Sequence, residues 1–196
     1  MTGKREITEA DLLPVEVFAR ERDARRKALA EIKKNRRVGV GPFANFYFEN
    51  YHTMWWQVQE MLYIEKGGAA QIADELAVYN PLIPKGRELV ATLMFEIDER
   101  ERRNRELARL GGVENSVGFT LDGETIRAEP TDDIERSTPE GRASSVHFLR
   151  FSFTEEQVAK FKDTSVKLAL EISHPHYGHS ALIPEPVRWA LSEDFD

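Results

Sequence analysis

Two stretches in the second half of the chain alternate apolar and polar residues. In "ELVATLMFEI" every second residue from the leucine onward is apolar, and "SVHFLRFSF" repeats the pattern farther along. Successive side chains of a strand point to opposite faces, so a period of two is typical of a strand with one buried face. We therefore predict inner strands over residues 89–97 and 146–153.

Each of these strands is followed by the signs of a helix and then of another strand. After the second strand, Thr154 and Gln157 have the spacing of a capping box. After the first strand, Asp98 is the expected N-cap of a helix, with the acidic residue Glu101 three positions later. "NSVGFTL" and "ETIRAE" flank an Asp-Gly turn, which indicates a hairpin, and "SVKLALEIS" closes the second unit. Two β-α-β units around a hairpin resemble a ferredoxin-like sandwich. The predicted fold is α+β, with an N-terminal helical part packed on a ferredoxin-like, mainly antiparallel sheet.

The first half of the chain has helical periodicity instead. One helix follows Pro14, and "HTMWWQVQEMLYIEK" carries its apolar residues along one side of a second helix. "YNPLIPKGR" then breaks the pattern with two prolines and a glycine. We expect residues 1–85 to be mainly helical with one or two short strands, and residues 86–196 to form the α/β part of one compact unit. The acidic stretch "EPTDDIERSTPEGR" predicts a mobile loop over about 129–143.

Composition narrows the classes of function. The chain has 196 residues, a formal net charge of -7 and no cysteine. The acidic balance argues against a general nucleic-acid binder, and the missing thiols exclude disulfides and cysteine nucleophiles. The N-terminal sequence lacks the apolar segment of a signal peptide, and no apolar run approaches the length of a membrane span. These features predict a cytoplasmic protein that binds neither nucleic acid nor membrane.

Three of the five histidines fall within "ISHPHYGHS". The alternation places His147 and His174 on the apolar faces of their strands, with His176 and His179 in a turn beyond. If each β-α-β unit is parallel, His147 and His174 lie ~20 Å apart, too far to share a zinc ion. No thiolate or nearby carboxylate completes a site, so we predict no metal and no cofactor, and expect His174 to bond a backbone carbonyl.

Glu60, with Gln57 one helical turn earlier, is the best candidate for acid–base chemistry, together with His147 or His174. A buried carboxyl group can acquire the raised pKa that a general acid needs. The alternative is structural, because a carboxylate on a buried helix needs a partner, and Arg150 or His147 is the expected one. Arg150 lies on the strand face opposite His147, so one of the two can face the helix.

Several segments together resemble a known bacterial family. "RRVGVGPFANFYFEN", "TMWWQVQEMLYIEK", "YNPLIP", "ATLMFEI", "VHFLRF" and "HPHY" occur in the order typical of the uncharacterised family called domain of unknown function 3501. The resemblance spans nearly the whole chain. Its signature falls on Phe48, Glu49, Trp55, Gln57, Gln59, Glu60, Glu65, Asn80, Pro81, His147, Arg150, Phe151, His174, Pro175 and Tyr177.

The resemblance implies a context rather than an activity, since genes of this family tend to lie near rubrerythrin-like and iron–sulfur redox proteins. The leading hypothesis is a non-enzymatic accessory or binding module with a redox or iron–sulfur protein partner, and a homodimer is compatible with it. The alternatives are a small-molecule enzyme using Glu60 and a histidine, and an iron or haem carrier using Tyr63, Glu65 and histidine. The expected ligand-binding residues are Trp55, Gln57, Glu60, Arg150 and Tyr177.

Overall fold

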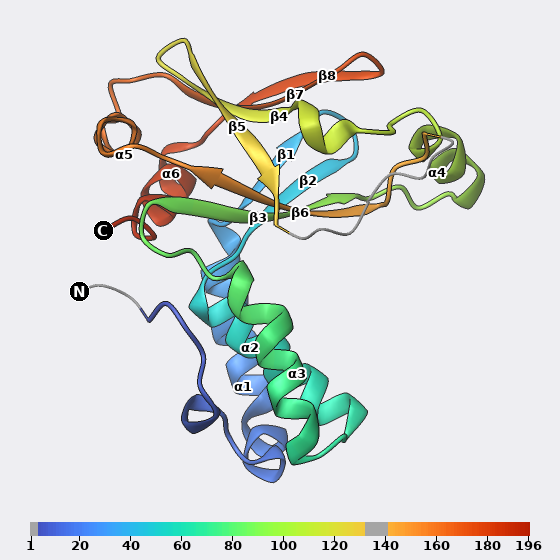
Figure 1. Ribbon diagram of the computed structural model, residues 1–196, viewed down its shortest axis with the longest axis vertical. Helices are drawn as coiled ribbons and strands as arrows, with labels where there is room; N and C mark the ends of the chain where they lie inside the picture. The colour runs from blue at the N-terminus through green and yellow to red at the C-terminus, as the bar shows by residue number, and fades with distance from the viewer. Residues whose placement is uncertain (1–3, 132–140) are drawn as a thin grey trace.

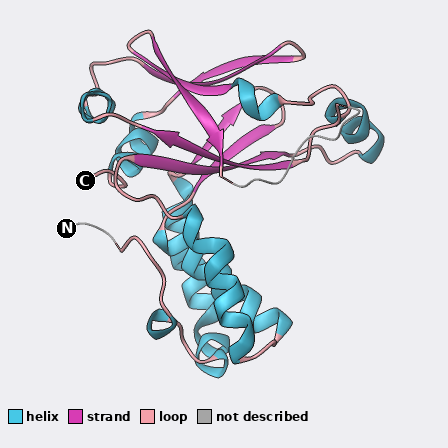
Figure 2. Ribbon diagram, viewed as in Figure 1, coloured by secondary structure: helices cyan, strands magenta, loops and turns pink. Residues whose placement is uncertain are grey.

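The structure is a computed structural model that describes residues 4–131 and 141–196. Within these residues the chain forms one sheet of eight strands, nearly closed into a barrel, and a helical arm that projects from it (Figures 1 and 2). The strands are β1 Arg37–Val40, β2 Ala44–Phe48, β3 Glu88–Phe95, β4 Val117–Leu121, β5 Glu124–Pro130, β6 Val146–Ser152, β7 Leu168–His174 and β8 Tyr177–Leu182.

The strands β3 and β6 confirm the two strands predicted from alternation. They are antiparallel neighbours, with Leu93 opposite His147 and Ala91 opposite Leu149. These four side chains are buried in the barrel. The β4–β5 hairpin is also present, and its turn places Asp122 and Gly123 at positive φ, as an Asp-Gly hairpin turn requires.

The predicted ferredoxin-like sheet of two β-α-β units is wrong. The strand order is β1-β2-β3-β6-β5-β4-β7-β8, and every neighbouring pair is antiparallel. Thus β6 and β5 separate β3 from β4, and β5 and β4 separate β6 from β7. Alternation sets which face of a strand is buried, but partners distant in sequence decide which strands become neighbours.

A single tyrosine bridges the seam between β1 and β8. The Tyr177 hydroxyl donates to the Val40 carbonyl at 2.7 Å and accepts from the backbone N–H groups of Phe43 and Ala44 at 3.2 and 3.0 Å. Gly41 beside it has φ +71, and a Cβ there would lie 2.6 Å from the His179 ring. The close approach of these groups therefore needs a glycine.

The helical arm has its own apolar core. Met54, Val58 and Leu62 of the second helix are buried with Ile7, as the sequence pattern predicted for that helix. In the described residues the helices are α1 Val15–Lys34, α2 Tyr51–Glu65, α3 Ala69–Tyr79, α4 Arg100–Leu107, α5 Glu155–Lys162 and α6 Glu185–Ser192, with 3₁₀ turns η1 Glu9–Asp11, η2 Asn80–Leu82 and η3 Val113–Ser116. None of the helices in the described part of the chain is both long and apolar enough to cross a bilayer.

The arm and the barrel are interleaved in sequence. The strands β1 and β2 come from residues 1–85 yet belong to the common sheet, in which β1 pairs with β2 and β2 pairs with β3. Val90 and Phe148, on the outer face of the sheet, pack into the core of the arm. The expected mobile loop over 129–143 falls largely on residues 132–140, which lie outside the described residues.

Residues 4–13 form an extended segment, which we call the strap, along the outside of the arm (Figure 1). It begins beside the barrel and ends where α1 starts. Ile7 is its one fully buried side chain, at 1% exposure. The strap thus joins both bodies of the molecule.

Candidate functional site

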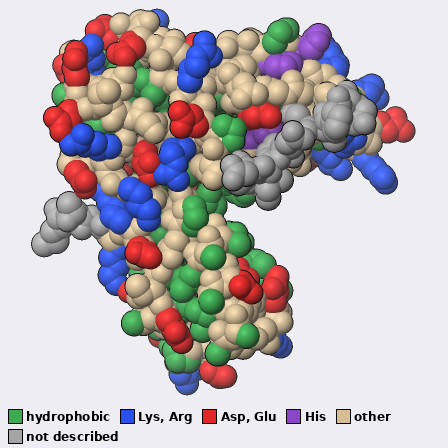
Figure 3. Space-filling model, in the orientation of Figure 1, with side chains coloured by type: hydrophobic (Ala, Val, Ile, Leu, Met, Phe, Trp, Pro, Cys, Tyr) green, Lys and Arg blue, Asp and Glu red, His purple; other side chains and the backbone are tan. Residues whose placement is uncertain are grey.

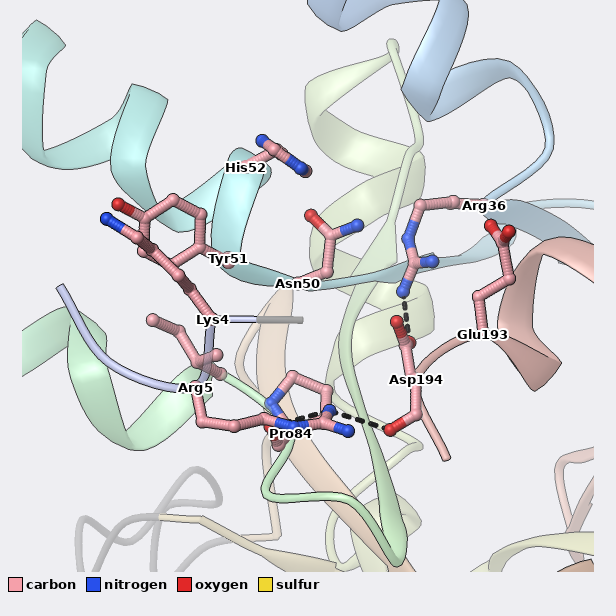
Figure 4. A pocket seen from close by; sticks show the side chains of 10 residues that line it. Lys4, Arg5, Arg36, Asn50, Tyr51, His52, Pro84, Glu193 and Asp194 are labelled. Carbon is pink, nitrogen blue, oxygen red and sulfur yellow. Dashed lines mark hydrogen bonds and ion pairs between the residues drawn. The ribbon is translucent and has the colours of Figure 1, made fainter. Parts of the chain in front are cut away.

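A pocket of about 450 Å³ lies where the arm meets the barrel (Figure 4). Five chain segments contribute to it: the strap, the turn after α1, the start of α2, the segment just before β3 and the segment after α6. Its lining residues are Lys4, Arg5, Arg36, Asn50, Tyr51, His52, Ile83, Pro84, Glu193 and Asp194. We call this cavity the junction pocket.

Arg36 is the buried cation of the junction pocket. It follows the end of α1 and is only 4% exposed. Its guanidinium donates to the carbonyl oxygens of Phe48, Glu49 and Ala190 at 3.0–3.1 Å and forms an ion pair with Asp194 (Figure 4). Burial raises the pKa of Asp194 above its usual value, and the charge of Arg36 opposes that rise. The pair fixes the guanidinium between barrel and arm.

The N-terminus of α2 opens onto the pocket. Asn50 caps the helix by accepting from the Thr53 N–H at 3.0 Å, while the Thr53 hydroxyl accepts from the Asn50 N–H at 2.9 Å. The N–H groups of Tyr51 and His52, in the first turn, have no partner within the helix because of their position. The helix dipole makes this end electropositive. Burial raises the pKa of the Tyr51 phenol, which therefore stays a hydrogen-bond donor at neutral pH.

Two further cations come from the strap. The Arg5 guanidinium donates to the Asp194 carbonyl oxygen at 2.7 Å and to the Asp196 carboxylate at 2.7 Å. Its Nε is buried and has no hydrogen-bond acceptor among the described residues. Lys4 pairs with Asp11 and lies 5.6 Å from the centre of the Tyr51 ring. The strap thus supplies positive charge to one wall of the pocket.

Cationic and anionic side chains both line the junction pocket. Lys4, Tyr51 and the first turn of α2 lie on one side, Glu193 and Asp194 lie on the other, and Arg5 reaches Asp194 (Figure 4). In residues 4–131 and 141–196 no group of three or more histidine and acidic side chains is placed to hold a metal ion. The pocket can receive a small molecule that carries an anionic group at its α2 end.

The chain matches a family profile described as "Protein of unknown function (DUF3501)" over residues 6–195. It belongs to this family. A crystal structure from Burkholderia pseudomallei, described as a novel protein of unknown function, is 36% identical and has a TM-score of 0.89, with 100% of both chains covered. No curated protein matches the chain. Neither description mentions a redox protein, so the predicted redox association is unsupported and we set it aside.

Three DUF3501 signature residues hold the strap rather than line the pocket. The Asn80 amide accepts from the Ile7 N–H at 2.8 Å and donates to the Ile7 carbonyl at 2.9 Å. Gln59 pairs in the same way with both backbone groups of Leu13, at 2.7 and 3.4 Å. The Trp55 indole donates to the Asp11 carbonyl at 2.8 Å. These side chains bind the backbone of the strap through hydrogen bonds.

Glu60 has a different partner from the expected one. It accepts two hydrogen bonds from Arg22 of α1, at 2.7 and 2.9 Å, so the expected contact with Arg150 or His147 is wrong. Arg22 also lies over the ring of Tyr63. Arg22 is the partner because α1 packs along α2 and brings Arg22 next to Glu60. The sheet contacts other residues of the arm. Gln57 donates to the Tyr79 hydroxyl at 3.5 Å.

Arg150 and Tyr177 lie apart from Glu60. Arg150, on the outer face of β6, pairs with Glu88 and donates to the Pro81 carbonyl at 2.7 Å, which joins sheet and arm. Tyr177 spans the barrel seam. The five expected ligand-binding residues are thus spread over both bodies, and the junction pocket, as lined by the described residues, includes none of them. Their ligand-binding role stays a prediction.

His147 and His174 lie at the same end of the barrel, contrary to the expected separation. In the strand order β6-β5-β4-β7 each neighbouring pair is antiparallel, so β6 and β7 run in opposite directions. The start of β6, with His147, therefore lies at the same end of the barrel as the end of β7, with His174. His147 is buried, with Nε2 3.0 Å from the Ser144 carbonyl oxygen and Nδ1 3.7 Å from Glu114. His174 lies 3.3 Å from the Gly111 carbonyl oxygen, which confirms the expected backbone contact.

The structure does not bring together the residues of the other histidine-based hypotheses either. His179 belongs to β8, not to the turn where it was expected. Histidines are visible at the barrel end far from the arm (Figure 3). Tyr63 and Glu65, the residues of the iron or haem hypothesis, lie on the arm, where Glu65 accepts from Gln71 at 2.8 Å. The barrel histidines and these two residues therefore belong to different bodies.

Sequence reasoning missed the residues that build the junction pocket. Arg5, Arg36, Asn50 and Asp194 are absent from the site residues predicted from the sequence. One local signal was available, because Asn50 with Thr53 before an apolar helix has the pattern of a helix cap. The other three residues carry no local pattern that announces their meeting.

Proposed function

We propose that this DUF3501 protein is a non-enzymatic binding module that holds a small molecule with an anionic group in the junction pocket. The observation that carries the proposal is the convergence of Lys4, Arg5 and the electropositive start of α2 on one cavity between two bodies. Ligand sites occur preferentially in such clefts. Helix N-termini with nearby cations favour anions.

The opposite wall narrows the class of ligand. Glu193 and Asp194 repel a second negative charge near α6, so a compact ligand with one anionic end fits better than a polyanion. Arg36 is already engaged by three carbonyls and Asp194 and acts as a fixed part of the wall.

The enzyme alternative has weaker support. Acid–base catalysis by Glu60 and a histidine needs both groups within reach of one substrate. Glu60 is engaged by Arg22 on the arm, whereas His147 is enclosed in the barrel. The junction pocket, as lined by the described residues, contains neither Glu60 nor His147 or His174.

Calorimetric titration with inorganic phosphate, and with acetate as a monocarboxylate probe, tests the proposal. We expect saturable binding of at least one probe and a rise in melting temperature with its concentration, because a ligand that binds only the folded state stabilises it. The His52 imidazole lines the pocket beside the first turn of α2. His52→Ala removes its ring N–H donor and should weaken binding of the anion about tenfold, the scale of one charge-assisted hydrogen bond.

His176→Ala is the matched control, since His176 is exposed in the β7–β8 turn at a distance from the pocket. It should bind the probe as the parent does. Absence of saturable binding of both probes to the parent protein would overturn the proposal, as would equal losses in the two histidine variants.

A further inference from the structure

The strap connects the junction pocket to the signature residues of the arm. Lys4 and Arg5 line the pocket. Ile7, two residues after Arg5, is held by two hydrogen bonds to Asn80. We propose that Asn80, Gln59 and Trp55 are positioning residues for the pocket, which act by docking the strap so that Lys4 and Arg5 face the ligand. This inference rests on the proposed function and assigns a role to residues that touch no ligand.

Five hydrogen bonds that dock the strap on the arm are made to its backbone. Asn80 and Gln59 each satisfy both the N–H and the carbonyl of one strap residue, and Trp55 satisfies a third carbonyl. An extended segment outside a sheet has no strand partner for these groups, so the side-chain amides replace one. Docking therefore depends on the arm residues more than on the strap's own side chains.

Ile7 is the single deep anchor of the strap. It is 1% exposed in the arm core, whereas Lys4 has a side chain that is 62% exposed. In an extended chain, Lys4 lies within ~10 Å of Ile7 along the backbone. Release of Ile7 from Asn80 therefore removes the nearest anchor of Lys4, whose own ion pair with Asp11 lies within the strap. It leaves the Arg5 guanidinium held by its hydrogen bonds to Pro84, Asp194 and Asp196.

Coupling of this kind works in both directions. If a docked strap raises the affinity of the pocket for an anion, the bound anion must stabilise the docked strap by the same factor. The strap offers an independent measure of docking, since Lys4 and Arg5 are trypsin sites that a docked backbone protects. Ligand should slow cleavage there.

The test uses the full-length chain with Asn80→Ala, which removes both hydrogen bonds to Ile7. Gln71→Ala is the matched control, because Gln71 is another amide of the arm whose contacts are Glu65, Glu75 and the Gly67 N–H. We expect Asn80→Ala to lower the affinity for the binding probe, phosphate or acetate, about tenfold and to speed trypsin cleavage after Lys4 or Arg5. Gln71→Ala should change neither.

A tether guards against a general folding defect. Thr8 and Ala77 line one shallow cavity beside Asn80, and the chain has no cysteine of its own. Thr8→Cys and Ala77→Cys, joined by a short bismaleimide in the Asn80→Ala background, should restore most of the lost affinity. If Asn80→Ala frees the strap and affinity is unchanged, or if the tether restores nothing, the coupling is wrong while the proposed function stands. If the parent binds neither probe, both proposals are wrong.

Discussion

At the residue scale, buried and half-buried charges in this protein are held by several atoms at once. Arg188 donates to the carbonyls of Lys160, Phe161, Asp163 and Val166, at 2.6–2.8 Å, and so caps the end of α5. Arg22 and Glu60 meet through two parallel hydrogen bonds. Such geometry is specific for arginine, whose planar donors a lysine cannot reproduce.

The Arg22–Glu60 pair gives the first prediction at this scale. Glu60→Gln should lower the melting temperature by about 2–4 °C, because the pair is only partly exposed and one charged partner is lost. Arg22→Gln combined with Glu60→Gln should cost little more than either change alone. Glu31→Gln, at an exposed position of α1, is the control in thermal melts followed by circular dichroism. A Glu60→Gln melt that coincides with the parent's would contradict a structural role.

At the element scale, α4 shows how a helix with almost no apolar face is stabilised. Its sequence "RERRNREL" has one buried residue, Leu107. Glu99 caps it by accepting from the backbone N–H groups of Glu101 and Arg102, both at 2.6 Å. These hydrogen bonds hold the pKa of the Glu99 carboxyl below its usual value of 4.5.

This cap predicts a pH dependence of α4. Because the pKa of Glu99 is lower in the folded state, its contribution to stability is present above the unfolded value of 4.5 and disappears as the pH falls through the folded value. Amide hydrogen exchange at Glu101 and Arg102 should therefore accelerate, relative to intrinsic rates, on acidification below 4.5. Glu99→Gln should show faster exchange already at neutral pH and little further change. Equal acid responses in both proteins would argue against the cap.

At the scale of the whole molecule, closure of the barrel depends on Tyr177. Its hydroxyl uses one donor and two acceptor interactions across the seam, all with buried partners. Burial raises the pKa of Tyr177, so the phenol keeps the proton that it donates to Val40.

Tyr177→Phe should therefore destabilise the protein by about 3 kcal/mol, because buried backbone groups of Val40, Phe43 and Ala44 lose their partner. For a chain of this length that corresponds to a fall in melting temperature of about 6–12 °C. Tyr63→Phe, on the arm, is the control in denaturant titrations with urea. A loss no larger than that of the control would show that the seam is closed by other contacts.

The sequence alone determined those features that depend on neighbours in the chain. The period of two in residues 89–97 and 146–153, the Asp122-Gly123 turn and the cap at Thr154 all act within a few residues, and each is present in the structure. The family was also recognisable, because its segments are contiguous stretches in a set order.

Only the tertiary structure decided which of these segments lie next to one another. Strand order depends on contacts between distant residues, so two apparent β-α-β units became parts of one antiparallel barrel. The junction pocket joins Arg5, Arg36 and Asp194, which are separated by most of the chain and share no spacing that a local pattern encodes. Signature residues such as Asn80 proved to bind the backbone of the strap, and the amino-acid type of an amide does not specify whether it will meet a ligand or a neighbouring segment.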